Sequence, residues 1–311
     1  MRIELACGVA ALLLVACGSD STNGADASGG GAGACGSPAG PFSLPLPPDA
    51  PTDYTTTTDT VTDGVTRLVW QRAVTSTQFD AADTGDPGDE ITAGQAYCAT
   101  LTLDGESGFV LPSRIELVTI QDQSVANPSI DVSAFPDTPA DVFWSSSRAA
   151  VGPTVYFAVS FSDGTVTYDG DIQGDQRVRC VLPDTSVPDP ATPYSTHGST
   201  TWDARTGLVW ERDPSTDTFM TTDEAAAHCK QLEVDGCGGF RLPTAKELDS
   251  IVDETRAGPA VDVDAFPDTD GWYWSSTEYP RTPGFWLAQS SGDGVMYPNV
   301  QPDGAHAPCV R

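Results

Sequence analysis

The strongest constraint on the fold is the repetition of a whole domain within one chain. Residues 98–138 and 229–269 align without a gap at an offset of 131, and 21 of 41 positions are identical. Before this block, "TRLVWQR" (66–72) matches "TGLVWER" (206–212) at an offset of 140, because the first copy carries an insertion. Such self-similarity indicates duplication of one structural unit. The sequence therefore predicts two tandem domains, residues 51–186 and 187–311, each large enough for its own core.

Within each copy, turn and capping signals predict an α+β domain. Asp-Gly or Asp-Ala pairs at 63–64 and 203–204 predict an opening hairpin, and Asp-Gly pairs at 163–164 and 293–294 predict a late one. Two short helices are expected between them. Their capping-box pairs are Thr92 with Gln95, Ser113 with Glu116, Thr221 with Glu224, and Thr244 with Glu247. The fold class is thus two short helices followed by a strand-rich second half, twice.

The amino terminus predicts export and a lipid anchor. A short basic start leads into an apolar run that ends "LVAC", similar to the lipobox of bacterial lipoproteins. We expect residues 1–16 to be a lipoprotein signal peptide, Cys17 to be lipidated, and residues 17–50 to form a flexible tether rich in Gly, Ser, Ala and Pro. An ordinary cleaved signal peptide is the alternative. The predicted location is the cell envelope, at the outer membrane or surface of a Gram-negative bacterium, with membrane contact through the lipid only.

The charge of the chain limits its partners. It has 44 acidic and 15 basic side chains, a formal charge of −29. Such a surface repels nucleic acids, anionic lipids and sulfated glycans, because no Lys/Arg patch is present to replace their counterions. Cations and neutral polymers remain as candidate ligands.

An ordered set of short motifs runs through both copies. In the second copy these are "TGLVWER", a cysteine on a helix, "GGFRLPTAKEL", "FPDT", "YWSST" and a terminal "CVR". The set resembles the bacterial domain named after the carboxy-terminal domain of the Legionella collagen-like adhesin, over nearly all of residues 51–311. The resemblance implies a C-type-lectin-like fold in each copy. The best-known member binds glycosaminoglycans, a ligand that the acidic charge of this chain argues against.

The resemblance also implies two disulfides, each between a helix cysteine and one in the last strand. These are Cys98 with Cys180 and Cys229 with Cys309, and only these cysteines occur in both copies. An exported chain forms such bonds. Cys35 and Cys237 are left over. Cys237 aligns with Glu106, and three states stay open for it: a bond to Cys35, a free thiol, or a bridge between molecules.

A catalytic site is not indicated. The three histidines, His197, His228 and His306, stand at unmatched positions, and neither G-x-S-x-G nor H-E-x-x-H is present. Trp70, Trp144, Trp210 and Trp274 recur among apolar neighbours and are predicted to pack in the core rather than to form a sugar-stacking platform. The aspartates of the "FPDT" motifs, 137 and 268, are predicted to cap turns. The chain is therefore not expected to be an enzyme.

Candidate ligand residues lie at and after the late hairpins, where the copies differ. They are Tyr168, Asp169 and Asp171 in the first copy, and Tyr297, Asn299 and Asp303 in the second. Asp303 belongs to "QPD", similar to the galactose-type loop of C-type lectins, although a Pro-Asp-Gly turn explains it as well. Calcium is a candidate cofactor because carboxylates are plentiful; no other cofactor is indicated.

Together these features predict a surface lipoprotein that binds or adheres to a polysaccharide or another envelope component, such as an envelope protein. The duplication would make binding bivalent if both copies keep a site. A structural envelope lipoprotein without a small-ligand site is the main alternative, and an enzyme with a scattered site is the third.

Overall fold

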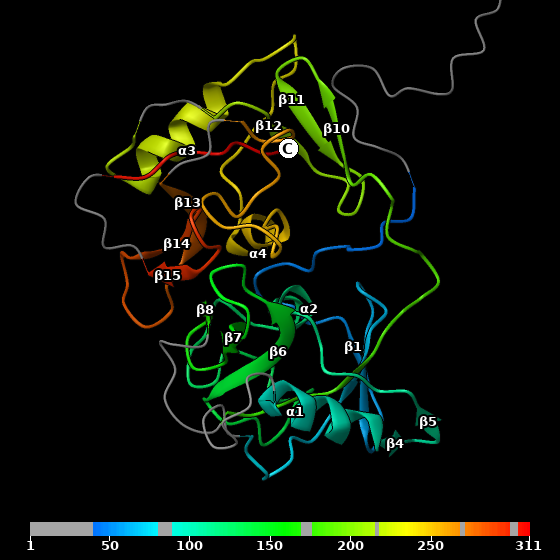
Figure 1. Cartoon of the computed structure of the whole chain (residues 1–311). Helices are drawn as coiled ribbons and strands as arrows, with labels where there is room; N and C mark the ends of the chain where they lie inside the picture. Colours follow the sequence, from blue (N-terminus) through cyan, green and yellow to red (C-terminus); the bar gives the residue numbers. More distant parts are fainter. Residues whose placement is uncertain (1–39, 80–88, 169–175, 215–217, 268–270, 299–303) are drawn as a thin grey trace, which may run out of the picture. The chain divides into compact units, whose positions relative to one another are not determined.

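A computed structural model describes residues 40–79, 89–168, 176–214, 218–267, 271–298 and 304–311 (Figure 1). All of them belong to one compact unit, Ala32–Arg311. The predicted signal peptide, the lipidation of Cys17 and the state of Cys35 lie outside the described residues. None of the helices in the described part has the length and apolar character to cross a bilayer.

Each repeat opens with the predicted antiparallel hairpin. Its strands are β1 (Tyr54–Thr56), β2 (Thr60–Asp63) and β3 (Val69–Gln71), and in the second repeat β10 (Tyr194–His197), β11 (Thr200–Asp203) and β12 (Val209–Glu211). After β2, the Asp63 carboxylate accepts hydrogen bonds from the Val65 N–H at 2.8 Å and the Thr66 hydroxyl at 2.8 Å. Asp203 accepts from Thr206 in the same way. The same Asx-type turn therefore joins β2 to β3 and β11 to β12.

Four helices are present in the described residues, two in each repeat: α1 (Asp89–Ala99), α2 (Arg114–Thr119), α3 (Thr222–Gln231) and α4 (Ala245–Ser250). The capping boxes predicted at Ser113, Thr221 and Thr244 are formed. The box predicted at Thr92 is wrong, because α1 begins three residues earlier and Thr92 lies inside the helix.

The late hairpins of the two repeats join in one six-stranded antiparallel sheet, ordered β13-β14-β15-β8-β7-β6. The strands are β6 (Val142–Arg148), β7 (Tyr156–Ser160), β8 (Val166–Tyr168), β13 (Trp272–Glu278), β14 (Trp286–Ser290) and β15 (Met296–Pro298). At the join, Val166 pairs with Met296. These two residues occupy equivalent positions, so the repeats meet through the same face, as the two subunits of a two-fold dimer do.

The remaining strands are short: β4 (Thr102–Leu103), β5 (Glu106–Ser107) and β9 (Val181–Leu182), the last of which pairs with β3. In the second repeat the corresponding end of the chain makes single bridges from Val310 to Trp210 and Arg241. The predicted closing strand is therefore formed in the first repeat and reduced to bridges in the second.

The four repeated tryptophans are core residues, as predicted. Trp70 and Trp210 are 0% exposed, Trp144 2% and Trp274 4%. Trp70 and Trp210 belong to one apolar cluster that draws residues from both repeats, whereas Trp144 and Trp274 pack in two smaller clusters, one around each disulfide. The prediction of a separate core for each repeat is therefore too simple, since the largest cluster is shared.

Both predicted disulfides are formed. Cys98 is bonded to Cys180 and Cys229 to Cys309, closing loops with sequence separations of 82 and 80. Cys237 is disulfide-bonded as well, so the alternative of a free thiol there is wrong. Its first-ranked partner, Cys35, lies outside the described residues.

Candidate binding site between the repeats

The sequence-predicted ligand residues include two that the structure places where the repeats meet. Tyr168 and Tyr297 are half-buried rather than exposed. The Tyr168 hydroxyl donates to Asp293 at 3.2 Å, and the Tyr297 and Thr167 hydroxyls lie 2.9 Å apart. Each bond crosses from one repeat to the other. The other four candidates, Asp169, Asp171, Asn299 and Asp303, lie outside the described residues, and a ligand role for all six stays a prediction.

Helices α2 and α4 pack together at this junction through buried charges (Figure 1). The Arg114 guanidinium of α2 is 1% exposed and donates to the Asp249 carboxylate of α4 at 2.5 Å and to its backbone carbonyl at 2.7 Å. In return, the Lys246 ammonium of α4 donates to the Thr119 carbonyl of α2 at 3.2 Å. Burial raises the pKa of Asp249 to about 6 and lowers that of Lys246 to about 8. The junction thus holds polar groups that are costly to leave unpaired.

Residues 42–49, which we term the strap, pass between the repeats and bond to both. The Leu44 N–H donates to the Arg205 carbonyl of the second repeat at 2.9 Å. The Gln123 N–H of the first repeat donates to the Asp49 carbonyl at 2.8 Å, and Lys246 donates to Pro48. The predicted flexible tether extended to residue 50, whereas the strap is held by hydrogen bonds along its length.

A cavity of about 300 Å³ lies where the strap meets both repeats. We term it the Asp49 cavity; its lining residues are Asp49, Gln123, Ser124, Thr277, Glu278, Tyr279, Pro280 and Pro283. Asp49 comes from the strap, and Gln123 and Ser124 come from the turn after α2. The other lining residues come from the end of β13 and the loop that follows it. Neither repeat contains this set of residues alone.

In the Asp49 cavity, hydrogen bonds leave one carboxylate oxygen bare. The Ala245 N–H donates to the Thr277 hydroxyl oxygen at 2.9 Å, so the Thr277 hydroxyl proton points to Asp49 Oδ2, also at 2.9 Å. Asp49 Oδ1 is buried and has no partner. Burial is the largest influence on this carboxyl group and raises its pKa. Asp49 therefore presents a desolvated acceptor that lacks a donor.

Gln123 supplies a second bare acceptor to the same cavity. Its side chain is 0% exposed. The Gln121 amide donates to the Ser160 carbonyl at 3.0 Å, and the Gln123 amide donates to Gln121 Oε1 at 3.5 Å. This chain of bonds orients the Gln123 amide and leaves its Oε1 without a partner. Two buried acceptors without donors in one cavity call for a donor from outside the chain.

The second cavity occupies the equivalent place on the other side of the junction. We term it the Glu254 cavity, of about 890 Å³, lined by Ser113, Ser146, Ser147, Arg148, Ala149, Ala150, Val151, Gly152, Pro153, Glu254 and Thr255. By sequence alignment Glu254 corresponds to Gln123, and Ser147 to Thr277. Here the acceptor does have a donor, because Arg114 Nε bonds the Glu254 carboxylate at 3.2 Å. At the position aligned with Arg114 the second repeat has Ala245.

One group in the described residues has the composition of a metal site, but its chemistry does not fit. Ligand atoms of Glu211, His228 and Cys309 lie within 4.8 Å of one another. Cys309 is held in a disulfide, so it has no thiolate to offer. Sequence reasoning missed this cluster, because the three residues are far apart in the chain. No catalytic arrangement follows from it.

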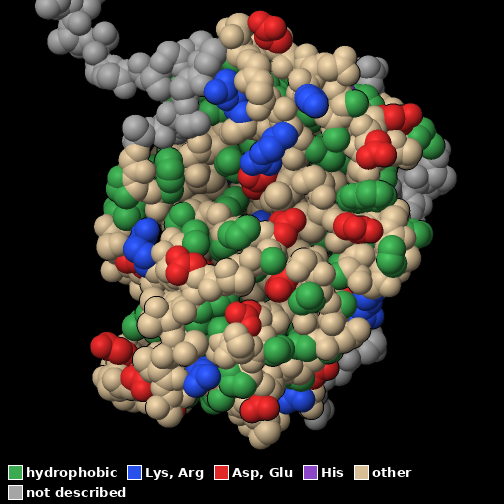
Figure 2. Space-filling view, turned by 180° about the vertical axis from the view of Figure 1, so that it is seen from behind, with side chains coloured by type: hydrophobic (Ala, Val, Ile, Leu, Met, Phe, Trp, Pro, Cys, Tyr) green, Lys and Arg blue, Asp and Glu red, His purple; other side chains and the backbone are tan. Residues whose placement is uncertain are grey.

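Acidic side chains are spread over the face seen in Figure 2 rather than gathered in one patch, with arginine and lysine between them. This distribution agrees with the excess of acidic residues in the sequence.

The Lcl C-terminal domain model matches residues 59–182 and again residues 199–311, which together make up most of the chain. The chain belongs to this family. Membership in the Lcl C-terminal domain family suggests an adhesin-like role and a place at the cell surface or outside the cell. Searches of curated proteins and of solved structures found no significant match.

Proposed function

We propose that this Lcl C-terminal domain protein is an adhesin-like surface lipoprotein that binds a polysaccharide at the junction of its two repeats. The C-type-lectin-like fold of each repeat and the lipid anchor at Cys17 are parts of this proposal. The family supports the adhesin-like role. The polysaccharide and the place where it binds are supported by the Asp49 cavity.

The observation that carries the proposal is the pair of bare acceptors, Asp49 Oδ1 and Gln123 Oε1, in one small cavity. Buried acceptors without partners cost free energy, of the order of 1–3 kcal/mol each, until a donor reaches them. Sugars carry many donors on a compact ring, and binding sites usually combine an apolar wall with a few such polar groups. Pro280 and Pro283 supply apolar wall beside the two acceptors.

The composite nature of the cavity gives the duplication a function. Because Asp49, Gln123 and Thr277 come from the strap, the first repeat and the second repeat, a single repeat would lack part of the site. Anionic glycans are poor candidates, since a carboxylate or sulfate would face Asp49 in a chain of charge −29. We also propose that the protein has no enzymatic activity.

The test is a glycan-binding screen of the full, oxidised chain, first with calcium and then with EDTA. We expect specific retention of polysaccharides without anionic groups. The variant Gln123→Met removes the acceptor at similar volume and should lose about tenfold or more in affinity. Glu254→Gln, the matched change in the other cavity, should bind as the parent does.

Three results would change the proposal. If no glycan binds, the result supports the alternative function, a structural envelope lipoprotein without a small-ligand site. If both variants bind like the parent, the site lies elsewhere, and the predicted ligand residues that follow β8 and β15 in the sequence are the next candidates. Loss of binding in EDTA would assign calcium a part in the site.

A further inference from the structure

We propose that the Asp49 cavity receives a protonated primary amine, so that the ligand is a polysaccharide containing amino sugars with free amino groups. This inference rests on the proposed function and narrows its ligand class. It comes from the difference between the two equivalent cavities.

In the Glu254 cavity the chain provides its own cation. The buried Arg114 guanidinium bonds Glu254 at 3.2 Å and Asp249 at 2.5 Å, so the negative groups there are compensated. In the Asp49 cavity Gln123 stands at the position of Glu254, and the strap adds Asp49, but the residue aligned with Arg114 is Ala245, whose side chain has no charge and no donor. The Asp49 cavity therefore lacks a cation that is hydrogen-bonded to its acceptors, because the Lys246 ammonium donates to backbone carbonyls and acts on Asp49 only through its charge.

An ammonium group matches the hydrogen-bonding needs of this cavity. It has three donors and no acceptor. Asp49 Oδ1 and Gln123 Oε1 are both bare acceptors. The third wall carries the Tyr279 hydroxyl, which donates its proton to Asp163 at 3.1 Å and so faces other groups as an acceptor. A neutral hydroxyl could satisfy one acceptor but would bring no positive charge to the buried Asp49 Oδ1, which has no hydrogen-bond partner.

The charges around the cavity also favour a cation. Lys246 is the positive group that influences the Asp49 carboxyl most, and its ammonium donates to the carbonyls of Pro48 and Thr119. On the other wall, Arg281 is paired with Asp163 at 3.7 Å. Glu278 lines the cavity and adds a further carboxylate. With these pairings made, Asp49 and Glu278 outnumber the single ammonium of Lys246, and an incoming cation would lower the cost of burying Asp49.

The experiment compares two oligosaccharides that differ only at nitrogen: a glucosamine oligomer with free amines and the N-acetylglucosamine oligomer of the same length. Binding to the full, oxidised chain is measured by calorimetry in the presence of EDTA. We expect the free amine to bind about tenfold tighter or more, because charge-assisted hydrogen bonds are about twice as strong as neutral ones.

Three variants locate the effect. Asp49→Asn keeps the shape and removes the charge, and it should abolish the preference for the free amine. Ala245→Arg places the Arg114 equivalent in the Asp49 cavity and should abolish amine binding. Glu254→Gln is the control and should keep the preference, and thermal unfolding confirms that each variant is folded.

The outcomes separate the two proposals. Equal affinity for the two oligomers would overturn the amine inference and leave the proposed function standing. Binding of methylammonium but of neither oligomer would overturn the polysaccharide function and keep an ammonium site. Binding of the free amine that is unchanged in Asp49→Asn would overturn the assignment of the site.

Discussion

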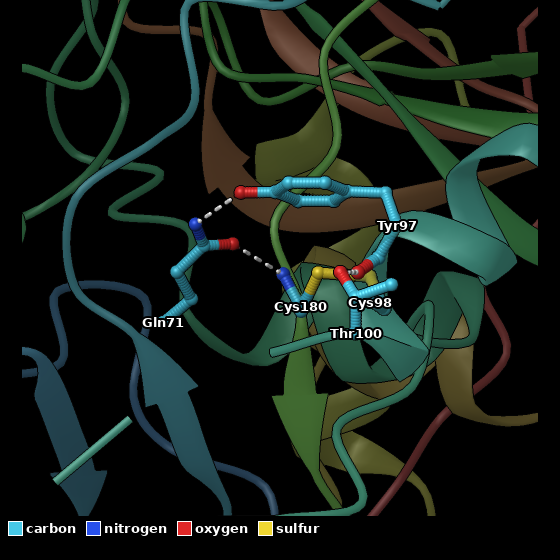
Figure 3. The surroundings of a disulfide bond; sticks show 5 residues. All are labelled: Gln71, Tyr97, Cys98, Thr100 and Cys180. Atoms are coloured by element: carbon cyan, nitrogen blue, oxygen red, sulfur yellow. Dashed lines mark hydrogen bonds between the residues drawn. A yellow bond between two sulfur atoms is a disulfide. The ribbon is translucent and has the colours of Figure 1, made fainter. Parts of the chain in front are cut away.

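The two disulfides sit in matching places in the two repeats, yet the side chains beside them differ in kind. In the first repeat Gln71 bridges the strand and the helix: its amide donates to the Tyr97 hydroxyl at 2.9 Å, and its Oε1 accepts from the Cys180 N–H at 3.2 Å (Figure 3). The aligned positions of the second repeat hold Glu211 and His228. A neutral pair with complete hydrogen bonds is thus replaced by a pair that can ionise.

The replacement leaves polar atoms unsatisfied. Glu211 Oε2 and His228 Nε2 are both buried without partners. Burial raises the pKa of Glu211 to about 7, and the negative charge of Asp213 adds a smaller increase. A hydrogen bond from the backbone of Cys309 acts in the opposite direction. The comparison teaches that duplication kept the scaffold and let the buried polar groups diverge, here and in the two cavities of the junction.

The largest effect should come from the disulfides, where the repeats are alike. Replacing Cys98 and Cys180 by serine, or Cys229 and Cys309, should each lower the free energy of unfolding by about 4.5 kcal/mol, because loops of similar length are released. Calorimetric unfolding of the two double variants measures this. Losses that differ severalfold would show that the scaffolds are not equivalent.

The next largest loss of stability should come from the buried ion pair between Arg114 and Asp249, which is present on only one side of the junction. Arg114→Ala leaves Asp249 buried without its guanidinium and should cost about 3–5 kcal/mol in denaturant unfolding. Asp249 aligns with Val118, so Arg114→Ala with Asp249→Val restores an uncharged contact. This double variant should recover most of the loss. A double variant no more stable than Arg114→Ala would contradict the charge argument.

The pair beside the second disulfide should give the second repeat a pH dependence. Because the pKa of Glu211 is raised from 4.5 to about 7, the folded state holds this proton more tightly than the unfolded state does. Its contribution to stability is therefore complete below about pH 4.5 and is lost as the pH rises through about 7.

Glu211→Gln with His228→Tyr copies the first repeat and removes this dependence. At pH 8 the variant should exceed the parent in unfolding free energy, by about 1–3 kcal/mol, whereas near pH 4 the advantage should shrink or vanish. Urea unfolding at the two pH values is the measurement. A gain of equal size at both would mean that packing, and not ionisation, separates the two pairs.

The smallest effect should come from the helix caps, where the repeats again agree. Ser113→Ala and Thr244→Ala each remove a capping-box hydroxyl and should cost about 1 kcal/mol. Thr92→Ala, at the box that is not formed, serves as the contrast: it should cost less than either. The three values can be compared in one set of thermal unfolding curves.

The sequence predicted the parts of the fold that depend on local sequence patterns. The duplication, the hairpins, three of four capping boxes and the core tryptophans follow from spacing and residue type. Both disulfides came from the family resemblance and the pairing of cysteines between copies. The start of α1 differs from the prediction because Thr92 lies inside the helix and not at its N-cap.

The candidate site was beyond reach of sequence reasoning for a physical reason. Asp49, Gln123 and Thr277 come from three distant segments, and no local pattern marks the arrangement that joins them. Tyr168 and Tyr297 lie in β8 and β15, the strands of the late hairpins that form the contact between the repeats. The only sequence signal of the site is a pair of differences between aligned copies, Arg114 against Ala245 and Gln123 against Glu254.

The strap also determines how the molecule would answer a mechanical load. Phe42 and Leu44 join the strap to both repeats, because the Phe42 carbonyl accepts from Arg67 and the Leu44 N–H donates to the Arg205 carbonyl. A load that passes along the strap is therefore shared between the two repeats before it reaches either core. If the proposed anchor and ligand are correct, drag on the polymer would act on the same strap that lines the proposed site.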